Sequence, residues 1–275
     1  MEPSLIRAAL AEDIGTGDLT SMYFVPADQR GRARVVARQR LVVSGAGVAE
    51  EVFRAVDPGV GVSRLAVDGG LLERDGVILE LEGAVRTLLS AERTALNFVQ
   101  HLSGIATLAR RFVDAVAGTR AVILDTRKTL PGWRALEKQA VRHGGGQNHR
   151  AGLFDAVLVK DNHIAAARAA GLDLAAVVGR LRAEHPGVRV QFEADTLDQV
   201  REFSSLGIDA ILLDNMSLDE LRRAVAMVAG RCLTEASGGV TLDTVRPIAE
   251  TGVDLISVGA LTHSAPAADI SMDLG

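Results

Sequence analysis

After Thr119, strand-like apolar runs and amphipathic helical stretches alternate regularly along the chain. Short apolar runs typical of buried strands occur at 121–125, 155–160, 188–194, 209–214, 232–236 and 254–258. Stretches with a helical period follow most of them, at 133–143, 165–183, 196–206, 218–229 and 241–250. This alternation predicts a parallel sheet covered by helices. Six such units occupy about 150 residues, whereas a complete eight-unit barrel needs roughly 250, so we expect a short or open α/β barrel.

Before Thr119, predicted strands and helices do not alternate regularly. This part of the chain reads as a helix at 4–11, strands at 32–43, 62–67 and 77–81, a helix at 46–56, and a further helix that starts with Ser90 as its N-cap. This mixture predicts an α+β domain over residues 1–103. The barrel domain would then cover residues 104–264, and residues 265–275 would return to the first domain.

The helix predicted from Ser90 has two distinct faces. One carries an apolar stripe with helical spacing, and the other carries Arg93, Asn97 and His101 at intervals of four residues. The polar row fits a solvated surface, and it also fits a face turned toward a ligand or a partner subunit.

The composition narrows the class of function. Aromatic residues make up 3% of the chain and the net charge is −5, which argues against nucleic-acid binding. A single cysteine, Cys232, excludes an internal disulfide and a cysteine-based metal cluster. No apolar run approaches membrane-spanning length, and the first residues, MEPSLIRAALAED, lack a basic apolar signal segment. We therefore expect a cytoplasmic protein that binds neither nucleic acid nor membrane.

Charged residues stand at the ends of the predicted barrel strands. The early strands end in Arg127, Lys128 and Lys160, and the later ones end in Glu193, Asp214 and Glu235, at intervals of 21 residues. The C-terminal strand ends of an α/β barrel meet at one mouth, so we expect a cationic half that faces an acidic half. The cationic half suits a small ligand with more than one carboxylate or phosphate. The acidic half would hold sugar hydroxyls or a divalent cation that bridges to phosphates.

Lysine is rare in this chain. Lys128, Lys138 and Lys160 are the only three, and the other 27 basic residues are arginine. Where arginine has replaced lysine almost everywhere, a retained lysine indicates a need for a compact ammonium charge. We expect functional roles for Lys128 and Lys160, and an inert helix-surface position for Lys138.

Small residues follow the last two strands, as Ser237-Gly238-Gly239 and Ser257-Val258-Gly259. Such segments let backbone N–H groups at a helix start approach a phosphate, as in the usual phosphate site of barrels. The run Gly144-Gly145-Gly146 has two interpretations. The first is the C-terminal end of a helix, and the second is a mobile loop beside a ligand.

Three histidines have different expected roles. His149, beside Arg150, suits a ligand contact and a surface position equally. His163 is expected to make a structural hydrogen bond, and His143 to end a helix favourably for its dipole.

Three motifs resemble those of quinolinate phosphoribosyltransferase. They are Asp125-Thr126-Arg127-Lys128-Thr129, Gly144-Gly145-Gly146-Gln147-Asn148-His149-Arg150 and Lys160-Asp161-Asn162-His163-Ile164. Further likeness covers nearly the whole chain, at 12–20, 92–98, 102–107, 213–216, 235–239 and 257–263. The resemblance implies that quinolinate and phosphoribosyl pyrophosphate give nicotinate mononucleotide, pyrophosphate and carbon dioxide, a step of NAD biosynthesis. It also implies an N-terminal α/β sandwich, an open TIM-like barrel, a homodimer and Mg²⁺.

The resemblance further implies roles for individual residues. Quinolinate would contact Arg127, His149, Arg150 and Lys160, with Arg93 supplied by the neighbouring subunit, and Thr126 belongs to the same substrate-binding set. Lys128, Glu193 and Asp214 would serve phosphoribosyl pyrophosphate and its Mg²⁺, the two carboxylates holding the metal directly or through water. Ser237, Gly238, Gly239, Ser257, Val258 and Gly259 would cradle the 5′-phosphate. Catalysis would depend on Lys128, Lys160, Glu193 and Asp214, and a lysine or a histidine would protonate the ring after decarboxylation.

Three other functions compete with this one. A paralogue in molybdate-uptake operons shares the fold and many motifs but would take another substrate. Nicotinate phosphoribosyltransferase uses a substrate with one carboxylate. This chain has more cationic residues at the strand ends than one carboxylate needs, which argues against that function. A non-catalytic barrel that binds a phosphometabolite would bind ligand without releasing pyrophosphate.

Overall fold

The protein is described here by a computed structural model covering residues 3–275, so Met1 and Glu2 of the predicted first domain lie outside the described residues. The chain forms two compact units. The first contains the residues up to Arg110, Leu130–Gly145 and Ser264–Gly275, and the second contains Arg111–Thr129 and Gly146–His263. The segment Leu130–Gly145, which the sequence pattern assigns to the barrel, therefore groups with the first unit.

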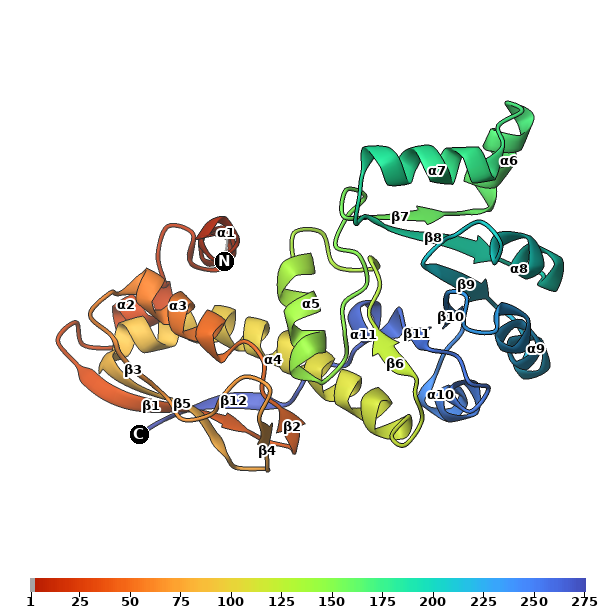
Figure 1. The fold of residues 1–275 in the computed structure, drawn as a ribbon. Helices are drawn as coiled ribbons and strands as arrows, with labels where there is room; N and C mark the ends of the chain where they lie inside the picture. The colour runs from red at the N-terminus through yellow and green to blue at the C-terminus, as the bar shows by residue number, and fades with distance from the viewer. Residues whose placement is uncertain (1–2) are drawn as a thin grey trace. The chain divides into compact units, whose positions relative to one another are not determined.

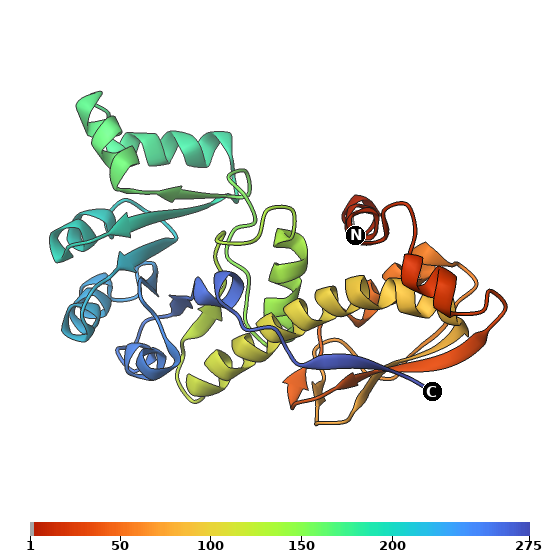
Figure 2. The same cartoon turned by 180° about the vertical axis from the view of Figure 1, so that it is seen from behind.

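A four-stranded antiparallel sheet organises the first unit. Its order is β12 (Ile270–Leu274), β1 (Arg30–Ala37), β5 (Val77–Ala84) and β3 (Gly61–Arg64). Figure 2 shows the last strand of the chain beside the first. A separate two-stranded ladder joins β2 (Leu41–Val42) to β4 (Leu71–Leu72). The predicted strand 32–43 is thus two strands, and β4 was not predicted.

Five helices belong wholly or mainly to this unit: α1 (Pro3–Ile14), α2 (Leu19–Phe24), α3 (Ala46–Val56), α4 (Val85–Ala115), whose last turn lies in the second unit, and α5 (Arg134–His143). Helices α3 and α4 lie over one face of the sheet (Figure 1). The core between them includes Val52, Phe53, Leu79 and Leu88, all fully buried. The predicted bounds of α3 are confirmed.

Helix α4 starts five residues earlier than predicted, at Val85. Ser90 is therefore not an N-cap. Its hydroxyl instead donates to Asp18 Oδ2 at 2.8 Å. Asp18 is itself the N-cap of α2, a helix that was not predicted, and its carboxylate accepts the Ser21 N–H.

Lys138 is buried, with 5% of its surface exposed, so the surface position predicted for it is wrong. It follows Glu137, which is fully buried and accepts a 2.8 Å hydrogen bond from His101 Nε2. The polar row on α4 is thus divided. His101 is engaged inside the unit, whereas Arg93 and Asn97 are exposed.

The second unit contains a six-stranded parallel sheet. Its order is β6 (Val122–Leu124), β11 (Leu255–Ser257), β10 (Leu233–Ser237), β9 (Ala210–Asp214), β8 (Arg189–Ala194) and β7 (Ala156–Val159). Within residues 3–275, the edge strands β6 and β7 do not pair with each other, so the predicted short, open barrel is confirmed.

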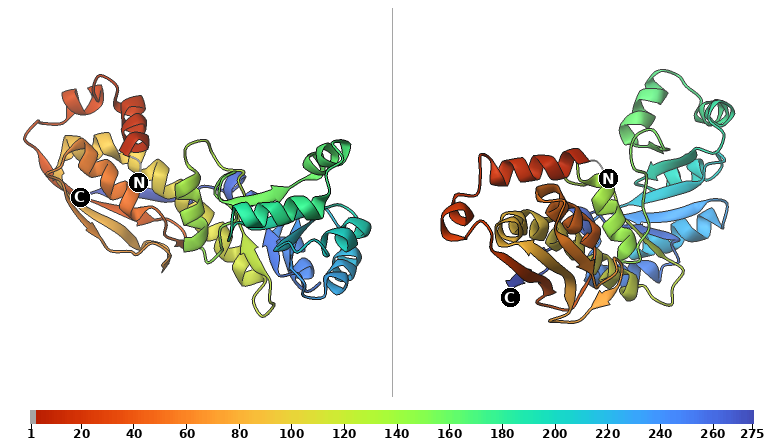
Figure 3. Two further views of the ribbon diagram at one scale, coloured as in Figure 1. Left: turned by 45° about the horizontal axis from the view of Figure 1, so that its top comes forward. Right: turned by 90° about the vertical axis from the view of Figure 1, so that its left-hand side faces the viewer.

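Helices cover the outer side of this sheet (Figure 3). They are α7 (Leu174–Glu184), α8 (Leu197–Phe203), α9 (Leu218–Val228) and α10 (Leu242–Ala249). In α9, Leu221, Ala224 and Val228 are buried at helical spacing, as expected for a helix that packs on a sheet. No helix within residues 3–275 combines the length and the apolar character needed to cross a membrane.

The single helix predicted at 165–183 is in fact two, α6 (Asp161–Ala169) and α7. Gly171 separates them with a φ of 68°, a conformation that costs glycine little. Asp173 then caps α7 by accepting the N–H groups of Ala175 and Ala176. Both signals are present in the sequence, because a glycine ends helices and an aspartate starts them.

Candidate active site

The carboxyl end of the parallel sheet forms a cavity of about 710 Å³, lined entirely by residues of the second unit. The predicted site residues that line it are Thr126, Arg127, Lys128, His149, Arg150, Lys160, Glu193, Asp214, Ser237, Gly238, Gly239, Ser257 and Gly259. Val258 is buried and does not line the cavity. Lys160 and Asp214, which were expected to share one opening, do share it.

Two guanidinium groups stand close together in this cavity. Burial lowers the pKa of Arg150, and repulsion from Arg127 lowers it further, while Asp155 acts in the opposite direction. One Arg150 nitrogen donates to the Ala156 carbonyl at 3.2 Å, which fixes the stem of the side chain. Two like charges held together without full solvation form a prepared site for an anion with two negative groups.

A buried carboxylate fixes the loop that carries Arg150. Asp125 follows β6 and is fully buried. It accepts the His149 N–H at 2.8 Å and the Asn148 side-chain amide at 2.5 Å. The pairing of Gln147 with Leu124 extends this attachment along the strand. Asp125 was not predicted to act in the site, although its position at the end of an apolar strand marks it in the sequence.

Lys160 and Glu193 form an ion pair of 2.5 Å between Nζ and Oε2. They follow β7 and end β8, respectively, which are neighbouring strands. The cationic and acidic groups are therefore less separated than their order along the chain suggests. His163 accepts the Lys160 N–H through Nδ1 at 3.0 Å, so the structural role predicted for His163 is confirmed.

Asp214 ends β9, and its carboxylate accepts the side-chain amide of Asn215 at 2.8 Å. Asn215 has a φ of 53°, in the left-handed region that asparagine tolerates better than most residues. Its backbone N–H donates to the Ser237 carbonyl at 2.9 Å. A side chain at Gly238 would overlap the Asn215 amide, so this glycine makes room for a neighbour of Asp214.

Glu235 was predicted to belong to the acidic half of the mouth, and it is among the residues that line the cavity, although protein side chains enclose it. The residue is fully buried on β10. Its carboxylate accepts hydrogen bonds from Gln191 Nε2 at 2.8 Å and from the Ser257 hydroxyl, and His149 Nε2 lies 3.4 Å from it. The apolar strand pattern could not reveal this, because the donors come from other strands. The Ser257 hydroxyl is thereby engaged with Glu235.

Two helix starts follow the small-residue segments. Thr241 lines the cavity and caps α10, because its hydroxyl accepts the Thr244 N–H. The short helix α11 (Ala260–His263) follows Gly259. A β-carbon at Gly259 would lie 3.1 Å from His263 Nε2 and 3.2 Å from Lys128 Cδ, so the backbone there is closely surrounded.

The cavity is also lined by three residues for which no role was predicted: Asn215, Thr241 and His263. His263 ends the last motif of the barrel half, and Thr241 has the spacing of an N-cap, so both had a signal in the sequence. Arg93, the last predicted site residue, lies on α4 in the first unit and is exposed.

Glu193 and Asp214 are the carboxylates available in the cavity for a metal ion. Within residues 3–275, no group of three histidine, cysteine, aspartate or glutamate residues could hold one. Two carboxylates fit Mg²⁺, which is usually held by one or two carboxylates together with substrate phosphates.

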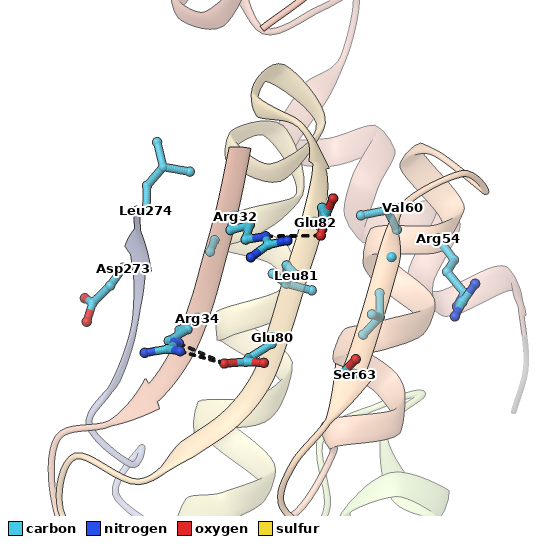
Figure 4. A pocket seen from close by; sticks show the side chains of 14 residues that line it. Arg32, Arg34, Arg54, Val60, Ser63, Glu80, Leu81, Glu82, Asp273 and Leu274 are labelled. Atoms are coloured by element: carbon cyan, nitrogen blue, oxygen red, sulfur yellow. Dashed lines mark hydrogen bonds and ion pairs between the residues drawn. The ribbon is translucent and has the colours of Figure 1, made fainter. Parts of the chain in front are cut away.

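A second hollow lies on the first unit, on the face of its sheet away from α3 and α4 (Figure 4). Cross-strand ion pairs join Arg32 to Glu82 and Arg34 to Glu80. None of the predicted site residues lines this hollow. Its charges neutralise one another, as on an ordinary solvated sheet face.

Comparisons with known proteins agree with these observations. Residues 18–103 match the family model for the N-terminal domain of quinolinate phosphoribosyl transferase, and residues 105–273 match the model for its C-terminal domain. A probable nicotinate-nucleotide pyrophosphorylase [carboxylating] of Bacillus subtilis is 43% identical over 98% of this chain and 92% of its own length. A chloroplastic nicotinate-nucleotide pyrophosphorylase [carboxylating] of Arabidopsis thaliana is 41% identical over 98% of this chain and 82% of its own length.

Solved structures include a close neighbour of the whole chain. The nicotinate-nucleotide pyrophosphorylase of Ehrlichia chaffeensis superimposes with a TM-score of 0.92 at 40% identity, covering 100% of this chain and 99% of its own. The likeness therefore includes both units and is not confined to the barrel motifs.

Proposed function

The chain belongs to the quinolinate phosphoribosyltransferase family, and from this premise we propose that it converts quinolinate and phosphoribosyl pyrophosphate to nicotinate mononucleotide, pyrophosphate and carbon dioxide. The observation that carries the proposal is the single cavity that combines Arg127, Arg150 and Lys160 with Glu193 and Asp214. The cations suit a ligand with two adjacent carboxylates, and the carboxylates suit a sugar that develops positive charge.

The cationic residues orient quinolinate. Arg127 and Arg150 hold its two carboxylates, and Lys160 adds an ammonium charge beside them. This grip directs the ring nitrogen at the anomeric carbon of the second substrate. Lys160 Nζ also pairs with Glu193 Oε2 at 2.5 Å, so the bound acid shares this ammonium group with Glu193.

The transfer step exchanges one bond for another. The bond from the anomeric carbon to the pyrophosphate oxygen breaks, and the bond to the ring nitrogen forms. Glu193 and Asp214 face the positive charge that develops on the ribose, and the Lys128 ammonium offsets the negative charge that grows on pyrophosphate. When bound by Glu193 and Asp214, directly or through water, Mg²⁺ supplies further neutralisation of the pyrophosphate.

The 5′-phosphate lies at the small-residue segments. Gly238, Gly239 and Gly259 bring backbone close to the ligand, beside the starts of α10 and α11. Backbone N–H groups at a helix start favour an anion. Ser237 can donate its hydroxyl, whereas Ser257 contributes only its backbone while its hydroxyl serves Glu235.

Decarboxylation follows the transfer. The quaternised ring nitrogen draws electrons, so the bond to the adjacent carboxylate breaks, carbon dioxide leaves, and the electron pair remains on the ring carbon. A proton then bonds to that carbon. No covalent bond between enzyme and substrate is required.

A homodimer, with Arg93 entering the neighbouring site, is part of the proposal. An exposed apolar surface on α2 supports it, since Leu19, Met22, Tyr23 and Phe24 are between 53% and 84% exposed. Arg86 holds this helix through the Met22 and Val25 carbonyls, and lies on the same face of α4 as Arg93. Large exposed apolar patches mark interaction sites.

We also propose that the enzyme acts in the cytoplasm, which subcellular fractionation of the native host would test.

One assay tests the function. The purified protein is incubated with quinolinate, phosphoribosyl pyrophosphate and Mg²⁺, and carbon dioxide and nicotinate mononucleotide are measured. We expect both products in equal amounts. Substitution of nicotinate for quinolinate should give no comparable turnover, and product from nicotinate alone, or ligand binding without pyrophosphate release, would contradict the proposal.

A further inference from the structure

Glu235 borders the cavity, but its side chain is fully buried. It stands in the middle of the parallel sheet, opposite Leu212 of β9 on one side and Leu255 of β11 on the other. Both of its carboxylate oxygens are engaged with protein side chains, so it acts through those side chains.

Three side chains from different parts of the unit converge on this carboxylate. Gln191 of β8 donates to Oε2 at 2.8 Å, and the Ser257 hydroxyl of β11 donates to Oε1. His149 Nε2 is 3.4 Å from Oε1. Burial raises the pKa of Glu235, but the contacts with His149, Ser257 and Gln191 outweigh it and leave the pKa below the ordinary value. The group is therefore an ionised, buried acceptor.

His149 connects this carboxylate to the cationic loop. Its Nδ1 accepts the Arg150 backbone N–H at 2.8 Å. A ring nitrogen that accepts a hydrogen bond carries no proton in the neutral imidazole, so the proton is on Nε2, which points at Glu235. The partner of one nitrogen thus determines the state of the other.

We propose that Glu235 is a positioning residue for the quinolinate subsite, holding His149 in its Nε2–H tautomer so that Nδ1 anchors the Arg150 backbone. This inference rests on the proposed function, in which Arg150 grips a carboxylate of the substrate. It also bears on the last step of the reaction. Both His149 nitrogens are engaged with the protein, so the proton that bonds to the ring carbon does not come from His149.

A purely structural role for Glu235 is the competing explanation, and Gln191 offers a matched control. Gln191 is 2% exposed and belongs to the same buried network, and its side-chain amide donates to Glu235 Oε2, the oxygen away from His149. Methionine is similar in size to glutamate and glutamine. Replacing either residue with methionine therefore removes a buried hydrogen-bonding group without a large change in volume. Both variants should unfold at lower temperature than the wild type, because each leaves buried polar partners unpaired.

Calorimetric titration with quinolinate alone, without the second substrate, separates the two roles. Glu235→Met should raise the dissociation constant of quinolinate at least about tenfold, while the KM for phosphoribosyl pyrophosphate changes by less than about twofold. Gln191→Met should leave the quinolinate dissociation constant within about twofold of the wild type. Equal weakening in both variants, or none in folded Glu235→Met, would overturn the inference. Glu235→Asp keeps the buried charge but places it farther from His149. If Glu235→Met does not fold, Glu235→Asp is measured instead, and the same weakening of quinolinate binding is expected.

A spectroscopic measurement keeps this inference distinct from the proposed function. Nitrogen-15 spectra of the histidine side chains should assign one fixed Nε2–H tautomer to His149 in the wild type, and Glu235→Met should lose it. Glu235→Gln should retain this tautomer, because the glutamine amide oxygen can still accept a hydrogen bond from His149 Nε2–H. A wild type that forms no nicotinate mononucleotide would defeat the proposed function, whereas an unaltered His149 spectrum in Glu235→Met would defeat the positioning role.

Discussion

Arg127 and Arg150 repel each other, and in the proposed function this repulsion favours the binding of an anion. It contributes, after burial, to the lowered pKa of Arg150. Like charges that are only partly solvated raise the free energy of the empty site, and an anion with two charges removes that cost when it binds. In the proposed site, a preference for a diacid over a mono-acid is then a property of these two side chains.

We predict that Arg150→Ala and Lys160→Ala each lower kcat/KM at least tenfold, which corresponds to about 1.4 kcal/mol of transition-state stabilisation. Each removes a cation from the cavity. Steady-state kinetics with quinolinate as the varied substrate measure the effect. Arg201→Ala is the control, since Arg201 is exposed on α8, forms an ion pair with Asp198 and is not among the residues that line the cavity. Near wild-type kinetics for Arg150→Ala and Lys160→Ala would remove the ligand role of both residues.

Asp209 makes stability depend on pH. Burial raises its pKa, but hydrogen bonds from Arg182 and the Val190 N–H, together with the Arg182 charge, outweigh this and lower it. A carboxyl group whose pKa is lowered by folding stabilises the protein above its unfolded pKa of about 3.9, and the stabilisation disappears as pH falls through the folded pKa. Urea unfolding should therefore show a higher free energy of unfolding for the wild type than for Asp209→Asn at pH 6, and this difference should disappear as the pH is lowered into the acid range. A difference that stays constant with pH would contradict this assignment.

At the scale of helices and strands, two glycines inside helices should respond in opposite ways to alanine. A β-carbon at Gly104 of α4 would overlap the Pro266 carbonyl and approach Ala267 Cα to 3.2 Å. A β-carbon at Gly179 of α7 would meet nothing within 4 Å. Gly104→Ala should destabilise the protein by about 1–3 kcal/mol, and Gly179→Ala should stabilise it by about 0.5–1 kcal/mol. Thermal unfolding measures both, and equal effects would show that the packing of residues 264–268 on α4 is looser than described.

The elements that could be predicted from the sequence are those with a local cause. The strand and helix beat of the barrel and the bounds of α3 follow from periodicity and turn residues near each end. The break between α6 and α7 had such a cause too, in Gly171 and Asp173, but the apolar pattern on either side concealed it. The early start of α4 was missed because no loop separates it from the preceding strand: β5 ends at Ala84 and the helix begins at Val85.

The parts that could not be predicted depend on distant partners. Nothing near Lys138 in the sequence indicates that α5 buries it. The burial of Glu235 depends on donors 86, 44 and 22 residues away, at His149, Gln191 and Ser257. The residues that line the cavity were predictable because parallel strand ends must converge, whereas the contacts behind them were not.

At the scale of the whole molecule, the proposed dimer makes a prediction about mixtures. Arg93→Ala and Lys160→Ala chains are each expected to be nearly inactive. If Arg93 serves the neighbouring site, a mixed dimer contains one site with both residues intact, so mixing the two chains should restore part of the activity. Kinetic assays after mixing, with heterodimers verified by differently tagged chains, measure this. Verified heterodimers without recovered activity would contradict a shared site.

The position of β12 affects how the chain is made. Residues 270–274 pair with β1, more than 230 residues earlier, and their pairing places Ala33 opposite Leu274. Translation proceeds from the N-terminus, so the sheet of the first unit cannot close until these last residues have left the ribosomal exit tunnel. Until then β1 has an unpaired edge, the kind of edge that recruits stray strands. The nascent polypeptide is thus open to aggregation at β1 until residues 270–274 have been synthesised and can pair with it.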